Sequence, residues 1–321
     1  MCVAGLAEIK RGPSGLPPTK GAPDGPRAPY PTLRPNGRGD HRPLFCLIDD
    51  TYPHLNPRAR CYESIKRLSD SEVIALALFG QLRGIESERS FLRDAERFFS
   101  HLFPGVVGLH PSSFHRRVRR LRRFLEPLRR VVLSELVGDP ETLIVDSTLL
   151  SVLQPRQVGH SSGLEGASWV RWGSFSVYGL KLHLICSTNR VPISYELSAA
   201  NAADVLLVRE LLAGAGLEEG TIIARRLFGD LAYRSGRLKE ELAEAGVLLQ
   251  TERAERRPAI RQQAEVCFAA LKRVFGMGET LATTLVGLAT RIAEKVTAYT
   301  YGLYINRLLG RPQGLIKELW A

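Results

Sequence analysis

A single acid stands near the end of an apolar stretch that reads TLIVDST, from Thr142 to Thr148. β-Branched and apolar residues fill the stretch and turn-forming residues flank it, which is typical of a buried strand. The acid, Asp146, is costly there, because burying a lone carboxylate costs several kcal/mol even after relaxation. A metal ion, a cationic partner or solvent at the strand end must offset that cost. The alternative interpretation is a strand that ends in a solvated Asp-Ser turn.

The charge balance of the 321-residue chain indicates an anionic partner. The net charge is +11 and the isoelectric point is about 9.7, which favours nucleic acid, a membrane surface or an acidic protein. No apolar run has the length of a membrane span and no signal-peptide pattern opens the chain, so we expect a cytoplasmic protein without a membrane partner. The cysteines are odd in number and scattered, which predicts reduced thiols without a zinc or disulfide framework: Cys2, Cys46, Cys61, Cys186 and Cys267.

The first part of the chain divides into an arm and a helical region. Residues 1–42 are rich in proline, glycine and arginine. They cannot bury enough surface to offset ordering, so we predict a disordered basic arm. Residues 43–138 have helical apolar spacing and are expected to form a DNA-binding domain. Two helix caps are expected there, each with two candidate serines: Ser69 or Ser71, and Ser112 or Ser113.

An arginine-rich helix in this region is the candidate DNA-binding element. Its apolar stripe is formed by Phe114, Val118, Leu121 and Leu125, and arginines fill its other faces. Each arginine could neutralise one phosphate. Because the arginines far outnumber the nearby acids, we favour nucleic acid over a solvated charged face. The candidate contacts are Arg116, Arg117 and Arg120, with Arg119, Arg122 and Arg123 beside them.

From residue 139 the pattern changes to strands. Strands are predicted at 142–148, 178–187, 191–198, 220–230 and 247–251, and helices at 204–214, 235–245, 257–275 and 279–309. Residues 154–176 are expected to form a polar loop, and 188–190 a hairpin turn. Three strands linked by hairpins and then alternating with helices predict a mixed five-stranded α/β sheet flanked by helices. A tail is expected at 311–321.

Three acids are expected to converge in this arrangement. Asp146 and Asp230 each end a strand, and these two strands can lie side by side. The helix after the fifth strand supplies Glu265. At about 100° per residue, Arg261, Glu265 and Lys272 share one edge of the packed face of that helix. Ordinary ion pairing on a helix surface explains Arg261 and Glu265 only in part, and it does not reach Lys272, about two turns away.

Such a group of acids predicts a site for divalent metal. Three carboxylates at one point repel each other, and a divalent cation removes that penalty. Mg²⁺ takes oxygen ligands and binds substrate phosphates. Two such ions about 4 Å apart activate water and stabilise the leaving oxygen of an in-line phosphoryl transfer. We therefore expect a divalent metal ion, with Mg²⁺ as the candidate, where Asp146, Asp230 and Glu265 converge.

These residues carry a resemblance to a known family. The segments VDST, GDLAYRS and RQQAEVCFAALK resemble the three acidic motifs of DDE transposases of bacterial insertion sequences. Many members share a signature of tyrosine, two residues, arginine, three residues, glutamate, six residues and lysine. Arg261, Glu265 and Lys272 match that spacing, and Pro258 stands at the tyrosine position. YGLKLHLICSTNRVP, the Asn201–Asp204 segment and TLVGLATRIAEKVTAYTYGLYIN are also similar, so the resemblance covers about residues 65–310.

The resemblance implies an RNase H-like catalytic domain at 139–310 and a DNA transposase activity. Asp146, Asp230 and Glu265 would be the catalytic residues and would bind two Mg²⁺ ions, with Mn²⁺ as a substitute. Arg261 and Lys272 would contact DNA phosphates near the cut. Water would attack a phosphodiester at the end of the element, and the freed 3′ hydroxyl would then attack target DNA. The implied partners are transposon ends, target DNA and a second copy of the chain in a synaptic dimer, in a bacterial cytoplasm at the nucleoid.

Further residues are weaker candidates. Tyr233 follows Asp230 closely and would contact DNA or serve in packing. A loop tryptophan, Trp169 or Trp172, would stack on an unpaired base or cover the edge of the core. Asp204 would border the site or act as a first-turn acid of its helix. His183 alternates within a strand, and we expect it to be structural.

Three other functions stay open at this stage. An RNase H-like nuclease or resolvase would use the same acids, but would not join a cut 3′ end to a second DNA. An inactive transposase-derived protein would only bind DNA, and Pro258 and the unusual arm leave room for it. A phosphatase-like enzyme with a small substrate is disfavoured by the positive charge and the arginine-rich helix.

Overall fold

The computed structural model describes most of the chain. Structure is described for residues 42–59, 61–138, 140–152, 164–172, 174–216, 224–251, 258–279 and 282–319. The predicted disordered arm lies outside these residues, except for Arg42 at the start of the first described helix. Among the described helices, none is long and apolar enough to cross a membrane.

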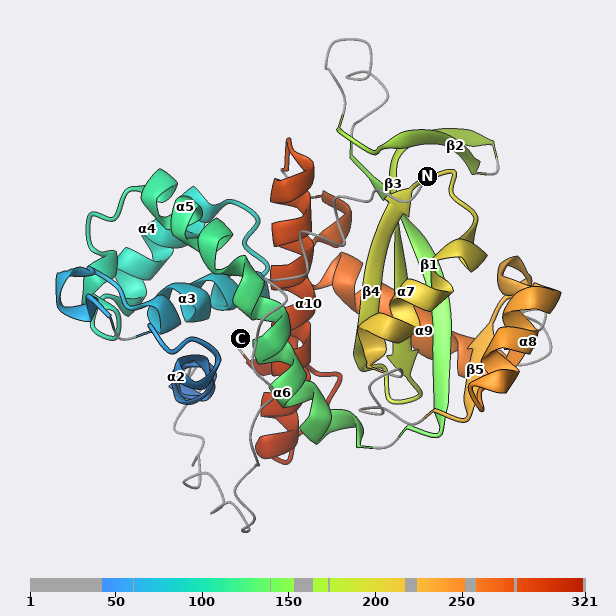
Figure 1. The fold of residues 1–321 in the computed structure, drawn as a ribbon. Helices are drawn as coiled ribbons and strands as arrows, with labels where there is room; N and C mark the ends of the chain where they lie inside the picture. The colour runs from blue at the N-terminus through green and yellow to red at the C-terminus, as the bar shows by residue number, and fades with distance from the viewer. Residues whose placement is uncertain are drawn as a thin grey trace.

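Six strands of the described chain form one mixed sheet (Figure 1). They are β1 Thr142–Ser151, β2 Ser168–Trp172, β3 Phe175–Ser187, β4 Pro192–Ala199, β5 Arg226–Gly229 and β6 Leu248–Thr251. β3 pairs antiparallel with β1, β2 and β4, whereas β5 and β6 continue the sheet from β1 in parallel. This order, with helices on the sheet, is the RNase H-like α/β fold that the sequence predicted, with six strands in place of the predicted five.

β2 corrects the prediction of a polar loop at 154–176. Within that segment Ser168–Trp172 pairs with the first part of β3. Its sequence SWVRW is rich in aromatic and β-branched residues, which suits a strand. The rings of Trp169 and Tyr178 lie 5.4 Å apart across this pair. The prediction failed because this short strand is stabilised by pairing with a neighbour rather than by a recognisable apolar pattern of its own.

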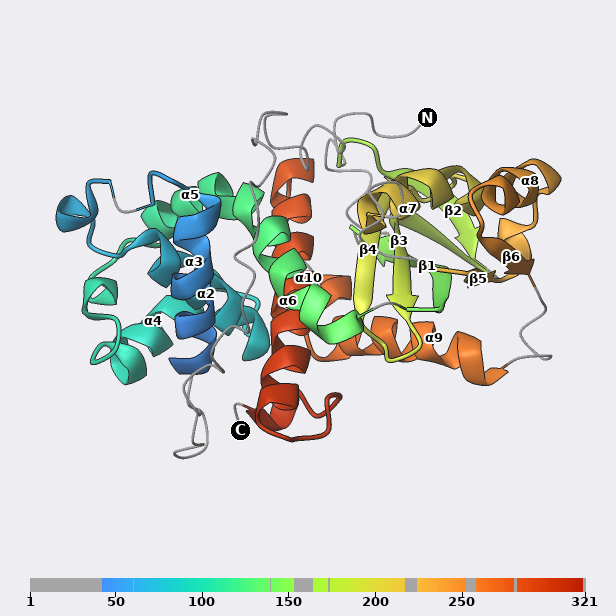
Figure 2. The same cartoon turned by 60° about the horizontal axis from the view of Figure 1, so that its bottom comes forward.

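Helices cover both faces of the sheet. α9 lies against β1, β3 and β5, whereas α7 and α8 lie on the opposite face (Figure 2). Two 3-10 turns, η4 and η5, lead into α7 and α8 respectively. The bounds of these elements are Pro258–Arg273 for α9, Val208–Ala215 for α7, Gly236–Glu244 for α8, Asp204–Leu207 for η4 and Leu231–Tyr233 for η5.

The described chain before β1 is helical, and we call α2 to α6 the helical part. Its helices are α2 Arg42–Leu55, α3 Asp70–Leu82, α4 Glu88–Phe99, α5 Pro111–Leu121 and α6 Leu125–Val137. A long helix, α10 (Leu285–Leu308), follows α9 in the chain and packs on α3 and α6. It therefore stands between the helical part and the sheet (Figure 1). The division into a DNA-binding domain at 43–138 and a catalytic domain at 139–310 stays a prediction.

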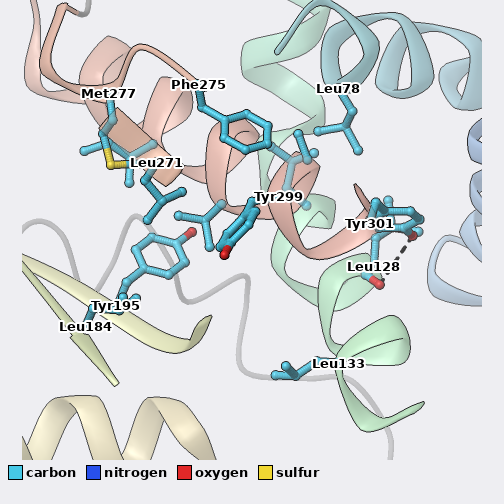
Figure 3. Close-up of a cluster of buried hydrophobic side chains, with 14 of the residues drawn as sticks. Leu78, Leu128, Leu133, Leu184, Tyr195, Leu271, Phe275, Met277, Tyr299 and Tyr301 are labelled. Atoms are coloured by element: carbon cyan, nitrogen blue, oxygen red, sulfur yellow. Dashed lines mark hydrogen bonds between the residues drawn. The ribbon is translucent and has the colours of Figure 1, made fainter. Parts of the chain in front are cut away.

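Side chains of both parts meet in one buried core beside α10 (Figure 3). Tyr299 and Tyr301 of α10 are buried there with leucines of α3 and α6. The hydroxyl of Tyr301 donates to the carbonyl of Leu128 on α6 at 3.5 Å. On the side toward the sheet, the rings of Tyr299 and Phe275 lie 5.6 Å apart. The helical part and the sheet are thus joined by shared apolar burial.

The start of the arginine-rich helix differs from the prediction. Ser69 caps α3 as predicted, since its hydroxyl accepts from the backbone of the third helical residue. Neither Ser112 nor Ser113 caps α5, because that helix begins earlier, with His110 as its cap and Pro111 as its first residue. Proline suits the first helical position, since its φ is already helical and its missing N–H would have no partner there. The helix therefore starts at the proline rather than at a serine.

One buried arginine also connects the helical part to the sheet. Arg129 on α6 has no exposed surface, and its guanidinium pairs with Glu126 at 2.7 Å. It donates to the carbonyl of Pro192 at 2.6 Å and to that of Ile193 at 2.7 Å, both at the start of β4. Its charge and its donors are therefore matched, which a fully buried cation requires.

We predict that Arg129→Met lowers the free energy of unfolding by about 2–4 kcal/mol, because it leaves two buried strand carbonyls without their side-chain donor and removes one of the cationic partners of Glu126. Denaturant unfolding followed by circular dichroism measures this loss. Arg119→Met is the matched control, since Arg119 is exposed on α5, and it should change stability by no more than about 0.5 kcal/mol. Equal effects of the two substitutions would contradict the role given to Arg129.

Candidate active site

Two of the predicted acids belong to neighbouring parallel strands: Asp146 lies within β1 and Asp230 directly follows β5. β1 and β5 run parallel, with Thr142 opposite Arg226 and Ile144 opposite Phe228. The same offset places Asp146 beside Asp230. The prediction that Asp146 ends its strand was wrong, because β1 continues to Ser151 through its pairing with β3, whereas β5 ends at Gly229. Asp230 directly follows β5 and caps the η5 turn, with its Oδ1 accepting from the backbone N–H of Ala232 at 2.9 Å. Strand pairing thus positions both carboxylates at one edge of the sheet.

The electrostatic environment of Asp146 includes all three predicted acids. Burial raises the pKa of Asp146 to about 6, and only 9% of the residue is exposed. The backbone N–H of Ser147 and the Arg261 guanidinium lower this pKa, whereas the charges of Asp230 and Glu265 raise it further. The structure therefore brings Asp146, Asp230 and Glu265 within electrostatic reach of one another.

α9 presents its charged residues toward the same edge of the sheet. Arg261 and Glu265 form an ion pair with 3.5 Å between Nε and Oε1, so the helix-surface pairing weighed from the sequence is also present. Lys272 reaches β1, where its Nζ donates to the hydroxyl of Thr148 at 2.5 Å. Burial lowers the pKa of Lys272. The helix wheel correctly placed these residues beside the packed face, and Pro258 is the first residue of α9.

The carboxylate oxygens of Asp146, Asp230 and Glu265 are ligands that Mg²⁺ prefers, although the three side chains are not closely grouped. Among the described residues, no three acidic, histidine or cysteine side chains are grouped closely enough to hold a metal ion. The side chain of Glu265 is 60% exposed and turns toward Arg261. Asp146 meanwhile feels two further negative charges, a penalty that a divalent cation removes. The carboxylate set thus suits Mg²⁺ chemically, and Glu265 has to turn away from Arg261 to join it.

The structure separates the arginines of α5 into exposed and internally bound ones. Arg116 and Arg120 are exposed, as a DNA contact requires. Arg117 differs, because its guanidinium donates to the carbonyl of Leu68 at 2.7 Å and pairs with Asp70 at 2.6 Å. These contacts hold its guanidinium against the helical part, and its role as a DNA contact stays a prediction.

The aromatic candidates take different positions. Tyr233 is fully buried, so its side chain packs and offers no surface to DNA. Its ring closes on the backbone at Gly229, where an added Cβ would lie 2.9 Å from Tyr233 Cδ2. Trp169 is 47% exposed and is therefore accessible to a ligand. Trp172 ends β2, and its side chain lies outside the described residues.

Two polar residues beside the acids had not been singled out from the sequence. Lys181 on β3 pairs with Asp204 at 2.8 Å, although it lies in a strand of apolar residues. Thr148 follows Asp146 by two positions, so it points to the same face of β1 and meets Lys272 there. The two-residue alternation of side chains along a strand could have identified them. Lys181 and His183 occupy alternate positions in β3, and Asp146 and Thr148 do so in β1.

Comparison with known proteins places this site in a recognised domain. The profile of the transposase DDE domain matches residues 137–301, just over half of the chain, and this range holds all three acids. A comparison with curated proteins gives no significant match.

Two solved structures are similar over most of the chain. A cryo-EM structure of a piggyBac transposase synaptic complex with hairpin DNA is 12% identical, with a TM-score of 0.42, over 89% of this chain and 82% of that one. A crystal structure of a pre-cleavage Mos1 transpososome is 8% identical, with a TM-score of 0.25, over 76% and 79%.

We predict that Asp146→Asn makes the metal-free protein more stable at neutral pH. The folded pKa of about 6 lies above the ordinary value of about 3.9, so wild-type stability falls as pH rises through that window. A neutral asparagine avoids this loss, which is about 1–3 kcal/mol at pH 7. Denaturant unfolding in EDTA at several pH values measures the difference.

Asp70→Asn is the matched control with the opposite sign. Burial raises the pKa of Asp70, but Arg117 and Lys66 outweigh burial and lower it overall. The control should therefore lose stability above the ordinary aspartate pKa and approach wild type in acid. A stability difference for Asp146→Asn that does not change with pH would show that Asp146 does not titrate abnormally.

Proposed function

The chain belongs to the transposase DDE domain family, and from this premise we propose that Asp146, Asp230 and Glu265 form the centre that cuts and joins DNA. The observation that supports this most is the parallel register of β1 and β5, which aligns Asp146 with Asp230. The second support is the charge of Glu265, which acts on Asp146 from α9. The metal would be Mg²⁺, with Mn²⁺ as a substitute.

The reaction consists of two phosphoryl transfers. In the first, water attacks a phosphodiester at the end of the element, the bond to the 3′ oxygen breaks, and a 3′ hydroxyl and a 5′ phosphate result. In the second, this hydroxyl attacks a target phosphodiester and displaces the 3′ oxygen of the target strand. Bound Mg²⁺ ions would activate the attacking oxygen and stabilise the leaving one. The three carboxylates would hold those ions.

The basic residues of α9 bind the DNA strand in this proposal. Lys272 reaches Thr148 on the same strand as Asp146, so its ammonium lies at the edge where a phosphodiester would sit. Arg261 pairs with Glu265 across 3.5 Å, too far for a hydrogen bond, and its Nε has no hydrogen-bond partner among the described residues. A phosphate would therefore supply the acceptor that Arg261 lacks, and would release Glu265 toward Asp146.

The exposed arginines hold DNA outside the cutting centre. Arg116 and Arg120 lie exposed on α5, and α4 packs against α5. α4 adds three exposed arginines, spaced four residues apart: Arg89, Arg93 and Arg97. These exposed arginines on two packed helices would bind the phosphates of an element end. Joining requires two ends at once, so we propose a homodimer in the synaptic complex, and light scattering with and without end DNA would test it.

The function is tested by a cleavage and joining assay on DNA ends that flank the gene, with Mg²⁺, Mn²⁺ or EDTA. Asp146→Asn, Asp230→Asn and Glu265→Gln should each reduce cleavage by at least about a thousandfold while end binding is retained. Glu240→Gln, an exposed change on α8, is the matched control and should leave cleavage unchanged. Full activity in any of the three variants would remove that residue from the centre.

The same assay separates the alternatives. Nicking without joining would indicate an RNase H-like nuclease or resolvase. Tight binding without cutting under any metal would indicate an inactive, transposase-derived DNA-binding protein. The ion pair that turns Glu265 toward Arg261 is the observation that keeps this last alternative open.

The DNA surface gives a separate prediction. Arg116→Ala and Arg120→Ala should each weaken end binding and lower the slope of log K against log salt concentration by about 1, because each removes one phosphate contact. Arg117→Ala should leave this slope unchanged and instead reduce thermal stability, because Arg117 binds Asp70. Fluorescence anisotropy over a salt series measures the slope, and an equal slope change for all three would contradict this assignment.

A further inference from the structure

A buried polar cluster lies behind the three acids, on the other face of the sheet. Asp146 and Thr148 point to the α9 face, since Thr148 meets Lys272 there. Ser147 therefore points to the opposite face, where it pairs in register with His183 of β3. Lys181, two residues before His183, shares that face. We use the term rear cluster for four residues: Lys181, His183, Asp204 and Tyr233.

The central contact of the rear cluster joins β3 to the η4 turn. Asp204 is the first residue of η4, and its Oδ1 accepts from Lys181 Nζ at 2.8 Å. The same Nζ donates to the carbonyl of Ala202 at 2.9 Å. His183 Nδ1 lies 3.7 Å from Asp204 Oδ1, and no hydrogen bond to Nδ1 forms among the described residues. The ion pair therefore fixes η4 against the strand next to Asp146.

η4 in turn contacts η5, the turn that begins after Asp230. Tyr233 closes η5, and its fully buried ring lies against Gly229, the residue before Asp230. Burial raises the pKa of the Tyr233 hydroxyl, and the charges of Asp204, Asp146 and Asp230 raise it further. Tyr233 is thus within electrostatic reach of Asp204 and of both acids, Asp146 and Asp230.

Two other roles for the cluster do not fit the geometry. Ser198, His183 and Asp204 have the residue types of a hydrolase triad, with 2.8 Å between Ser198 Oγ and His183 Nε2. Ser198 and His183 have no exposed surface, so no substrate reaches them. A fourth metal ligand at Asp204 does not fit either, because the ammonium of Lys181 already binds its carboxylate.

We propose that Asp204, held by Lys181, is a positioning residue that fixes the separation of Asp146 and Asp230 and thereby sets the metal affinity of this centre. The chain of contacts runs from β3 through the ion pair to η4, then to η5 and Asp230. The inference rests on the proposed function, because it takes Asp146 and Asp230 as metal ligands. Residues that orient metal ligands from behind typically contribute about 10–100-fold to metal affinity.

The test measures Mn²⁺ binding to the purified full chain by the electron paramagnetic resonance signal of free Mn²⁺. Asp204→Asn should weaken Mn²⁺ binding by about tenfold, because η4 loses the contact that holds it to β3. Binding of end DNA in EDTA should stay at the wild-type level, since the DNA surface lies elsewhere. An unchanged Mn²⁺ affinity in a folded Asp204→Asn protein would overturn the proposal.

Asp70→Asn separates positioning from a general loss of stability. Asp70 resembles Asp204 in exposure, with side chains 15% and 14% exposed, and each pairs with a lysine. Asp70 lies in the helical part, away from the acids. This control should lose stability but keep the wild-type Mn²⁺ affinity. An equal loss of Mn²⁺ affinity in Asp70→Asn would show a general stability effect and overturn the proposal.

Lys181 provides a second pair of variants in case Asp204→Asn does not fold. Lys181→Arg keeps the charge and should keep Mn²⁺ affinity near the wild-type value, whereas Lys181→Met should lose it as Asp204→Asn does. Equal affinities of these two variants would overturn the proposal.

Asp146→Asn distinguishes this inference from the proposed function. If wild type and Asp146→Asn bind Mn²⁺ equally, the metal centre itself is wrong, and the inference fails with it. If Asp146→Asn loses Mn²⁺ and Asp204→Asn does not, only the inference fails. Loss of affinity in both, with the Asp70→Asn control intact, supports both.

Discussion

The parallel pairing of β1 with β5 is the constraint on which the candidate centre depends. Leu143 and Leu227 are paired directly and are fully buried, so apolar burial fixes the register before either acid is reached. Each buried leucine contributes about 1.5–3 kcal/mol. The raised pKa of Asp146, about 6, corresponds to a penalty of about 3 kcal/mol at most. Apolar burial along the two strands therefore outweighs the cost of burying Asp146, which comes mainly from desolvation and in smaller part from the charges of Asp230 and Glu265.

The position of α9 depends on the helical part as well as on the sheet. Lys295 of α10 donates to the carbonyl of Phe275, just after α9, and pairs with Glu86 at 2.7 Å in the segment before α4. Arg129 makes a second connection, from α6 to the start of β4. The arginine-bearing helices and the helix that carries Glu265 are therefore held in one framework. Its connections are buried and hydrogen-bonded, which favours a fixed arrangement of the two.

The sequence predicted the parts of this protein that depend on local pattern. The apolar runs around Asp146 and Asp230 indicated two strands that can lie side by side, although β1 continues past Asp146 to Ser151. The helical period placed Arg261, Glu265 and Lys272 on one edge of α9. Pairings between distant residues were not predicted, since a pattern shows which face a side chain occupies but not its partner. Arg117 meets Asp70, 47 residues away, and β2 exists through its pairing with β3.

The two faces of β1 have different roles at the candidate centre. Asp146 and Thr148 face α9, where charged groups remain partly exposed and available to DNA, whereas Ser147 faces the rear cluster. A buried ion pair adds little net stability compared with apolar side chains of similar size. Stability alone therefore gives no reason for the ion pair of Lys181 with Asp204. The directional nature of the contact gives a reason, because an ion pair at 2.8 Å holds η4 at one position on β3. Apolar packing has no such direction and would allow the turn beside Asp230 several positions.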